Sequence, residues 1–237
     1  MENQFDREAL LIGAEAVKKL QASHVAIFGI GGVGSYIAEA LARAGVGQLT
    51  LIDSDVVTLT NLNRQLIALH STLGQAKTEV MAARIRDISP DCDVRSVPEA
   101  YTPETRERFF AERPDYIADA IDSVGCKLDL IETAITRGIP ILSAMGTGNR
   151  LDPTQFVITD LAETSGDPLA RVMRAGLRKR GIVHHTVLYS KAPPCKLLSS
   201  PEDGSRPVPG SVSWCPSVAG LMMAGYIVNA LISQTDE

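Results

Sequence analysis

A glycine-rich turn is the first feature of the sequence that could do chemistry. Gly29, Gly31 and Gly34 form the pattern G-x-G-x-x-G, and Gly32 adds a fourth glycine to the turn. Glycines let a phosphate approach the backbone closely, and the amides at the start of a following helix can bind it. The turn therefore predicts a nucleotide site, although the same glycines could serve only the tight packing of a helix on a strand.

Polar residues after the turn bear on which nucleotide would bind. Asp53 follows Gly34 by nineteen residues, at the position where a carboxylate can bind ribose hydroxyls. The segment then adds further polar side chains, among them Asp55, Asn61, Arg64, Gln65 and Lys77. An Arg and a Lys that converge on one crevice suit a triphosphate, whose charge must be spread during attack. This segment therefore favours ATP over a dinucleotide.

Asp122 follows another apolar run, at the edge of the sheet where ligands bind in doubly wound folds. A carboxylate there could hold Mg²⁺ beside phosphate oxygens. Structural roles stay open for each of these residues. Asp53 could cap a turn, and Asp122 could bind loop amides. Arg64 could form a surface ion pair, and Lys77 could be a solvated helix residue.

Short apolar runs alternate with helical patterns through the first 145 residues. The runs predict strands at 25–28, 49–52, 94–97, 116–121 and 139–144. The patterns between them predict helices at 35–44, 76–88, 103–111 and 128–136. This alternation predicts an α/β fold, Rossmann-like, with a doubly wound and mostly parallel sheet.

The second half of the chain is more elaborate. It predicts an edge-like strand at 156–159, a strand at 187–189, and a helix from Pro168 to about Arg180 capped by Asp167. A loop at 199–210 and a final helix after Pro216 follow. We expect one domain over 1–237, with a nucleotide-binding half at about 1–150 and a substrate-binding or dimer half at about 151–237.

Composition narrows the function classes. The net charge is −5 and the sequence pI is about 5.4, which excludes a protein that holds nucleic acid by bulk charge alone. The four cysteines form no C-x-x-C pair, so we expect no zinc and reduced thiols in a cytoplasmic protein. The apolar run 218–232 is shorter than the about 20 residues that cross a bilayer, so we expect a buried helix and no membrane span.

Taken together, these motifs resemble the ubiquitin-activating-enzyme-like superfamily, whose members adenylate carboxylates with Mg-ATP. The resemblance extends over nearly the whole chain. It implies that the glycines line the phosphates and that Asp53 binds ribose. It further implies phosphate contacts from Asn61, Arg64 and Lys77, and a role for Asp122 in holding Mg²⁺.

The N-terminal segment bears on oligomeric state. The family often begins with Arg-aromatic-x-Arg, and the second Arg reaches the ATP of a partner subunit. Here the segment reads Gln4-Phe5-Asp6-Arg7, so the second Arg is kept and the first is replaced. The resemblance implies a homodimer in which Arg7 acts in trans.

Four further segments resemble one branch, the tRNA threonylcarbamoyladenosine dehydratases. They are Asp119-Ala-Ile-Asp-Ser123, Asp152-Pro-Thr-Gln155, Thr159-Asp160-Leu161 and Asp167-Pro-Leu169. The resemblance implies a tRNA that carries threonylcarbamoyladenosine as substrate, and ATP-dependent cyclisation of that group. An adenylyltransferase for a ubiquitin-like sulfur carrier is the main alternative, with a sulfur-transfer protein as partner. A nicotinamide-dependent oxidoreductase and a non-catalytic nucleotide-binding scaffold also stay open.

A basic stretch stands out in this acidic chain. Between Pro168 and Pro201 there are basic residues and no acid. Arg171, Arg174 and Arg178 have helical spacing and share a face, and Lys179 and Arg180 follow them. We hypothesise that this face binds the tRNA backbone, and the alternative is a solvated helix face.

Overall fold

Seven strands form one sheet in the computed structural model, which describes residues 3–198 and 209–233. The strands are β1 (His24–Phe28), β2 (Gln48–Ile52), β3 (Asp93–Val97), β4 (Tyr116–Asp119), β5 (Ile141–Ala144), β6 (Phe156–Asp160) and β7 (Thr186–Ser190). Their order across the sheet is β3-β2-β1-β4-β5-β7-β6. All neighbouring strands are parallel except β6 and β7, which are antiparallel. The two halves of the sequence therefore share a single sheet.

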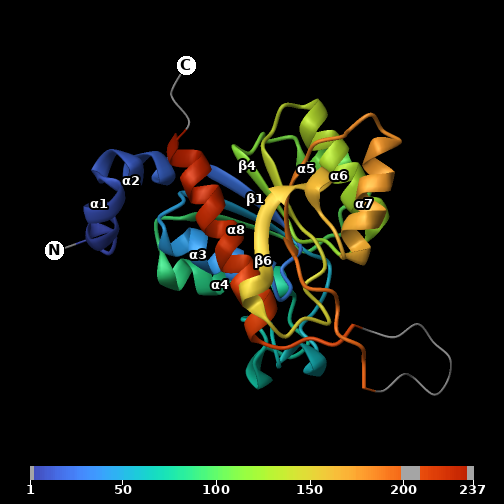
Figure 1. The fold of residues 1–237 in the computed structure, drawn as a ribbon. Helices are drawn as coiled ribbons and strands as arrows, with labels where there is room; N and C mark the ends of the chain where they lie inside the picture. Colours follow the sequence, from blue (N-terminus) through green and yellow to red (C-terminus); the bar gives the residue numbers. More distant parts are fainter. Residues whose placement is uncertain (1–2, 199–208, 234–237) are drawn as a thin grey trace.

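Helices cover both faces of this sheet (Figure 1). They are α1 (Asp6–Ile12), α2 (Ala14–Gln21), α3 (Gly34–Arg43), α4 (Lys77–Ile88), α5 (Arg106–Phe109), α6 (Val124–Thr136), α7 (Pro168–Arg178) and α8 (Trp214–Ser233). Four short 3₁₀ turns complete the described elements, η1 (Leu59–Asn61), η2 (His70–Thr72), η3 (Pro153–Gln155) and η4 (Leu161–Glu163). Side chains of α3, α4 and α8 form one apolar core with the sheet, and those of α6 and α7 form the other.

The central strands are buried on both faces, which is why they read as continuous apolar runs. Every residue of β1 is buried. The carboxyl ends of β1, β2 and β4 are level, because Phe28 lies opposite Ile52 on one side and Asp119 on the other. The chain runs from β1 outward through β2 and β3, and then crosses back to β4 on the other side. A topological switch point therefore lies between β1 and β4.

The predicted doubly wound α/β fold is confirmed, with changes at particular elements. The helices α1 and α2 were not predicted. The helix α5 is shorter than the predicted 103–111, and α6 begins at Val124 rather than at 128. The final helix begins at Trp214 instead of after Pro216. A proline in the first turn of a helix is tolerated because its missing N–H would have no partner there.

The helix α8 is also longer than the predicted apolar run. Its 20 residues make it long and apolar enough to cross a membrane by length and composition alone. One face of α8, including Ala219, Met223 and Ile227, is buried in the core against the sheet and α3. A core helix passes the same test, so the criterion is weak evidence for a span. At its start, the indole N–H of Trp214 donates to the carbonyl of Leu151 at 2.8 Å.

Candidate active site

A cavity of about 670 Å³ opens at the switch point of the sheet. Its walls come from the ends of β1, β2 and β4 and from loops that follow β3 and β5. Almost all of the predicted nucleotide-binding residues line it, namely Gly29, Gly31, Gly32, Asp53, Asp55, Asn61, Arg64, Gln65, Lys77 and Asp122. Ligands of doubly wound proteins bind at this place in the fold.

Two positions of the glycine turn have no room for a side chain. Gly29 has φ +90°, and a Cβ atom there would lie 2.7 Å from the carbonyl oxygen of Ala120. A Cβ atom at Gly34 would lie 1.7 Å from the carbonyl oxygen of Gly29. Gly34 is not among the described residues that line the cavity. Its place in the pattern is therefore explained by helix packing under the turn, whereas Gly29, Gly31 and Gly32 form the surface that a phosphate would meet.

Asp53 connects the glycine turn to the segment that carries Asp55. One of its carboxylate oxygens accepts a hydrogen bond from the backbone N–H of Ile30 at 2.6 Å, and the other accepts from the N–H of Asp55 at 2.8 Å. The ammonium of Lys77 lies 2.7 Å from the Asp55 carboxylate and 3.9 Å from that of Asp53. Lys77 is buried, so its charge is held in the cavity wall by these two acids.

Asn61 is the last residue of η1, and Arg64 and Gln65 stand on the turn that follows. The side chain of Asn61 accepts from the backbone N–H of Thr58 and caps η1. The guanidinium of Arg64 donates to the carbonyl of Thr60 at 2.8 Å and to Asn63 at 3.0 Å. The buried amide oxygen of Gln65 has no hydrogen-bond partner among the described residues. This turn therefore presents the Arg64 cation to the cavity, whereas the amide oxygen of Gln65 is itself buried.

Asp122 is exposed in the loop between β4 and α6. Beneath that loop, the ammonium of Lys127 lies 2.9 Å from Asp119, and both side chains are fully buried. Lys127 also donates to the carbonyl of Ile121 at 3.0 Å. The ion pair therefore fixes the backbone next to Asp122. Lys127 was not among the residues predicted to belong to the site.

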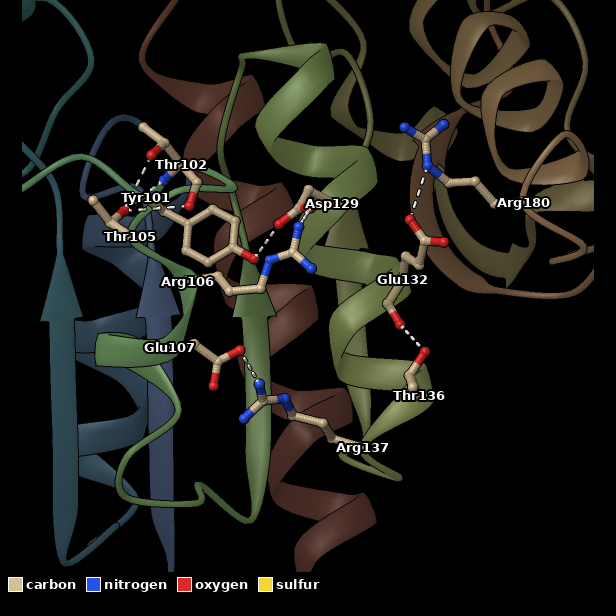
Figure 2. Close-up of polar contacts among 10 residues, drawn as sticks. All are labelled: Tyr101, Thr102, Thr105, Arg106, Glu107, Asp129, Glu132, Thr136, Arg137 and Arg180. Atoms are coloured by element: carbon tan, nitrogen blue, oxygen red, sulfur yellow. Dashed lines mark hydrogen bonds and ion pairs between the residues drawn. The ribbon is translucent and has the colours of Figure 1, made fainter.

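One end of the cavity is apolar and aromatic. Tyr101 lines it beside Phe28, with ring centroids 5.3 Å apart and nearly perpendicular planes. Figure 2 shows the hydroxyl of Tyr101 pointing at Asp129 of α6, to which it donates at 2.7 Å, while Arg106 pairs with the same carboxylate. Burial and the bond to Asp129 raise the pKa of Tyr101, so the phenol stays protonated.

The opposite end of the cavity is formed by Thr147 and Gly148 after β5, and by Pro209, Ser211 and Pro216 before and within α8. None of these residues, nor Tyr101, was predicted. The signal that could have found Tyr101 and Thr147 is their position, because both follow the carboxyl end of a parallel strand, as Asp53 and Asp122 do.

Arg7 lies outside this cavity. It is exposed on α1, a helix that buries none of its residues and projects from the sheet with α2 (Figure 1). The cavity of one protomer is therefore built without Arg7 among the described residues that line it.

The basic residues predicted to bind tRNA on and after α7 differ in their surroundings. Arg171, Arg178 and Lys179 are exposed and form no ion pair with the rest of the described chain. Arg174 instead donates to the carbonyls of Leu161 and Thr164, and Arg180 pairs with Glu132 of α6 at 3.0 Å (Figure 2). Arg174 therefore holds η4 against α7. It is not a free surface cation, although the sequence predicted that it shares an exposed basic face with Arg171 and Arg178.

Two histidines and a cysteine outside the cavity lining are also placed by the structure. His184 is exposed, whereas His185 is buried and its ring nitrogen lies 2.8 Å from the hydroxyl of Ser143. Burial lowers the pKa of His185 to about 4. Cys215 is fully buried in the first turn of α8, and burial raises the pKa of its thiol.

Comparison with known proteins identifies the family. Residues 5–237 match the ThiF family. The chain belongs to the ThiF family. A tRNA threonylcarbamoyladenosine dehydratase of Bacillus subtilis (strain 168) is 44% identical to it over 247 aligned residues, which cover 100% of this chain and 97% of the relative.

Solved structures of ThiF-family relatives agree with this fold. The tRNA N6-threonylcarbamoyladenosine dehydratase of E. coli, TcdA, in complex with ATP superposes with a TM-score of 0.88 at 36% identity, over 97% of this chain and 94% of that one. Its complex with AMP gives a TM-score of 0.90. The sulfur carrier protein ThiS adenylyltransferase of E. coli is a more distant match, 32% identical over 62% of this chain and 60% of its own length.

The geometry suits the adenylation of a carboxylate. The glycine turn and the start of α3 offer backbone amides to phosphate oxygens. Arg64 and Lys77 supply positive charge, and Asp122 supplies a carboxylate without an ion pair among the described residues. One carboxylate beside phosphate oxygens and water is a common way for proteins to hold Mg²⁺, so the residues present fit that ion.

Proposed function

We propose that this chain is an ATP-dependent tRNA threonylcarbamoyladenosine dehydratase. The observation that carries the proposal is the full-length similarity to the Bacillus subtilis dehydratase, together with a cavity that unites the glycine turn, Asp53, Arg64, Lys77 and Asp122. Dinucleotide chemistry would need little beyond the glycine turn and the ribose acid, so the additional charges favour ATP over a nicotinamide cofactor.

The reaction begins with attack of the threonyl carboxylate on the α-phosphorus of ATP. An acyl–phosphate bond forms and pyrophosphate leaves, which gives an acyl-adenylate. Arg64 and Lys77 stabilise the negative charge that develops on the phosphates. Mg²⁺, bound by Asp122 together with phosphate oxygens and water, would add Lewis-acid stabilisation when present.

Ring closure completes the dehydration. The carbamoyl group of the same nucleoside attacks the activated carbonyl, AMP leaves, and the oxygen lost from the substrate departs in AMP. Because both groups belong to one nucleoside, this step is intramolecular and positioning contributes much of its rate. The chemistry needs no cysteine nucleophile, in agreement with the burial of Cys215.

The partners belong to the same proposal. We place tRNA on the exposed cations of α7, and the enzyme in the cytoplasm with its substrate. A second copy of the chain would cover α1, where Leu10 and Leu11 are 76% and 88% exposed. It would bring Arg7 to the ATP of its partner. A sulfur-transfer protein is a further candidate partner, on the strength of the superfamily resemblance only.

Mass spectrometry of tRNA nucleosides tests the function. Purified protein is incubated with tRNA that carries threonylcarbamoyladenosine, with and without Mg-ATP. We expect the nucleoside to lose one water only when ATP is present. Lys77→Met should abolish the loss, whereas Lys18→Met on the exposed face of α2 should retain it. An unchanged nucleoside despite ATP binding would favour adenylation of a sulfur-carrier tail instead.

A further inference from the structure

The loop after β5 contains the one non-glycine residue with a positive φ in the described chain. Asn149 has φ 56°, in the left-handed region, which asparagine tolerates better than most side chains because its amide can bond locally. The backbone is therefore held in an uncommon conformation at this position, two residues after the cavity-lining Thr147.

Asn149 joins this loop to the segment before α8 by a two-way contact. Its backbone N–H donates to the carbonyl of Gly210 at 2.7 Å, and its side-chain oxygen accepts from the N–H of Gly210 at 2.7 Å. The carbonyl of Asn149 in turn accepts from the N–H of Cys195 at 2.8 Å. One residue thus connects three segments that lie far apart in the sequence.

The segment that Asn149 holds forms a wall of the cavity. Pro209 and Ser211, on either side of Gly210, both line it. Ser211 is held from the opposite side as well, because Asn63 donates to its carbonyl at 2.9 Å. The wall continues to Pro216, whose side chain would lie 3.2 Å from a Cβ atom at Gly32. It therefore abuts the glycine turn directly.

This wall lies away from Tyr101, because β3 and β5 stand on opposite sides of β1 in the sheet. We expect the ribose at Asp53 and the phosphates at the glycine turn, which leaves the adenine on the Tyr101 side. A carboxylate that displaces pyrophosphate from the α-phosphorus must approach that atom in line, from the side opposite the leaving pyrophosphate. The walls at Thr147, Gly148, Pro209 and Ser211 are left for the acyl substrate.

We propose that Asn149 is a positioning residue for the acyl substrate. By its left-handed backbone and its two bonds to Gly210, it fixes the wall against which the threonylcarbamoyl arm is placed for attack. It touches neither nucleotide nor reacting atoms itself. The proposal rests on the dehydratase function, because that function supplies the identity of the acyl group.

Three substitutions separate the side-chain bond from the backbone conformation. Asn149→Gly keeps the left-handed φ at no steric cost and removes the acceptor for Gly210. Asn149→Asp keeps an acceptor of the same length. Asn149→Ala loses the acceptor and is strained at this φ. Asn229→Ala is the matched control, because Asn229 is exposed on α8 and, among the described residues, its side chain bonds only the carbonyl of Gly225 in its own helix.

The readouts are kcat/KM for modified tRNA, the affinity for ATP, and the thermal unfolding midpoint. We expect Asn149→Gly to lower kcat/KM for tRNA by on the order of tenfold, with ATP affinity and the unfolding midpoint close to wild type. Asn149→Ala should be at least as impaired for tRNA. Asn149→Asp and Asn229→Ala should stay within about threefold of wild type on every measure.

Two results would overturn the inference while leaving the dehydratase function intact. One is an Asn149→Gly enzyme that processes tRNA like wild type. The other is a parallel loss of ATP affinity, which would mean that the residue supports the cavity in general. Wild-type protein that fails to dehydrate the nucleoside in the same assay would instead reject the proposed function, and the inference with it.

Discussion

At the scale of single residues, the buried ion pair of Asp119 and Lys127 fixes the backbone of the loop that carries Asp122. Neither side chain reaches water, and one oxygen of Asp119 has no hydrogen-bond partner in the described chain. A buried pair contributes little net stability over apolar residues, but breaking it leaves an uncompensated charge. The pair instead positions the site loop, because Lys127 also donates to the carbonyl of Ile121, next to the exposed Asp122.

Lys127→Met should therefore destabilise the fold by about 3–5 kcal/mol, because Asp119 would be left buried and unpaired. Urea unfolding measures the loss. Adding Asp119→Asn to Lys127→Met should recover much of it, since no charge then remains in the core. Lys18→Met, which breaks an exposed pair with Glu15, should leave the unfolding midpoint unchanged. A Lys127→Met midpoint equal to wild type would contradict the burial of this pair.

His185 should give the protein a sensitivity to acid. Its pKa falls from about 6.5 in the unfolded chain to about 4 in the folded protein because burial disfavours the charged ring. The unfolded state therefore binds a proton first as the pH falls, so the stability present above pH 6.5 is lost as the pH drops toward 4. Linkage predicts a loss of about 1 kcal/mol between pH 7.5 and 5.5 from this residue.

Urea unfolding of wild type and of His185→Gln at several pH values checks this. Glutamine can keep the bond to Ser143 without titrating. The variant should lose less stability than wild type over the same interval. Equal losses would mean that other groups carry the acid sensitivity.

Individual site residues differed in how well the sequence could predict them. Asp53 and Lys77 were predictable because the charge pattern after the glycine turn has a stated chemical use. Lys127 was not predictable, since a helix lysine looks the same on a surface or in a site. Tyr101 carried only the positional signal of a residue that follows the carboxyl end of a strand. Gly34 was assigned to the phosphates, whereas its steric contact with Gly29 explains it better.

At the scale of elements, α7 has two functions on one helix. Met173 and Leu177 pack into the core and Arg174 anchors η4, while Arg171 and Arg178 face outward. The helical period correctly placed the three arginines near one another. It could not show that Arg174 bonds inward, because the carbonyls of Leu161 and Thr164 come from a turn about ten residues earlier that tertiary packing brings close.

The outward cations of α7 should determine the salt dependence of tRNA binding. Replacing Arg171 and Arg178 with Glu should weaken binding and reduce the slope of log affinity against log salt by about 1.5, if each neutralises one phosphate. Filter binding across salt concentrations measures this. Arg95→Glu, on the strand β3 at the far side of the sheet, is the control and should leave the slope unchanged. An unchanged slope in the double variant would exclude this face.

The buried strands were predicted from the sequence, and the two short N-terminal helices were not. The strands β1, β2 and β4 are buried on both faces, so their apolar runs stand out. The helices α1 and α2 are short, with seven and eight residues, and only Val17 and Leu20 of α2 are buried. Among the described elements, α2 packs against α1 and α8, and its Leu20 joins the core that α8 forms with the sheet.

At the scale of the whole molecule, that exposed α1 leads to a test of assembly. If Arg7 acts in trans, Arg7→Ala and Lys77→Met enzymes should each be inactive but complement one another when mixed. Random exchange makes half of the dimers mixed, each with one intact site of two, so about a quarter of wild-type activity should return. Dehydration of the nucleoside by the mixture measures this, with each variant alone as control. No recovery despite dimers in solution would reject the trans role.

The single tryptophan of the chain makes its intrinsic fluorescence a local probe. Trp214 is half-exposed, bonded to the carbonyl of Leu151, and two residues before Pro216 at the acyl end of the cavity. All indole emission from the protein therefore originates beside the acyl end of the cavity. Without any attached dye, a spectral change on adding tRNA but not ATP would distinguish filling of that end from filling of the nucleotide end.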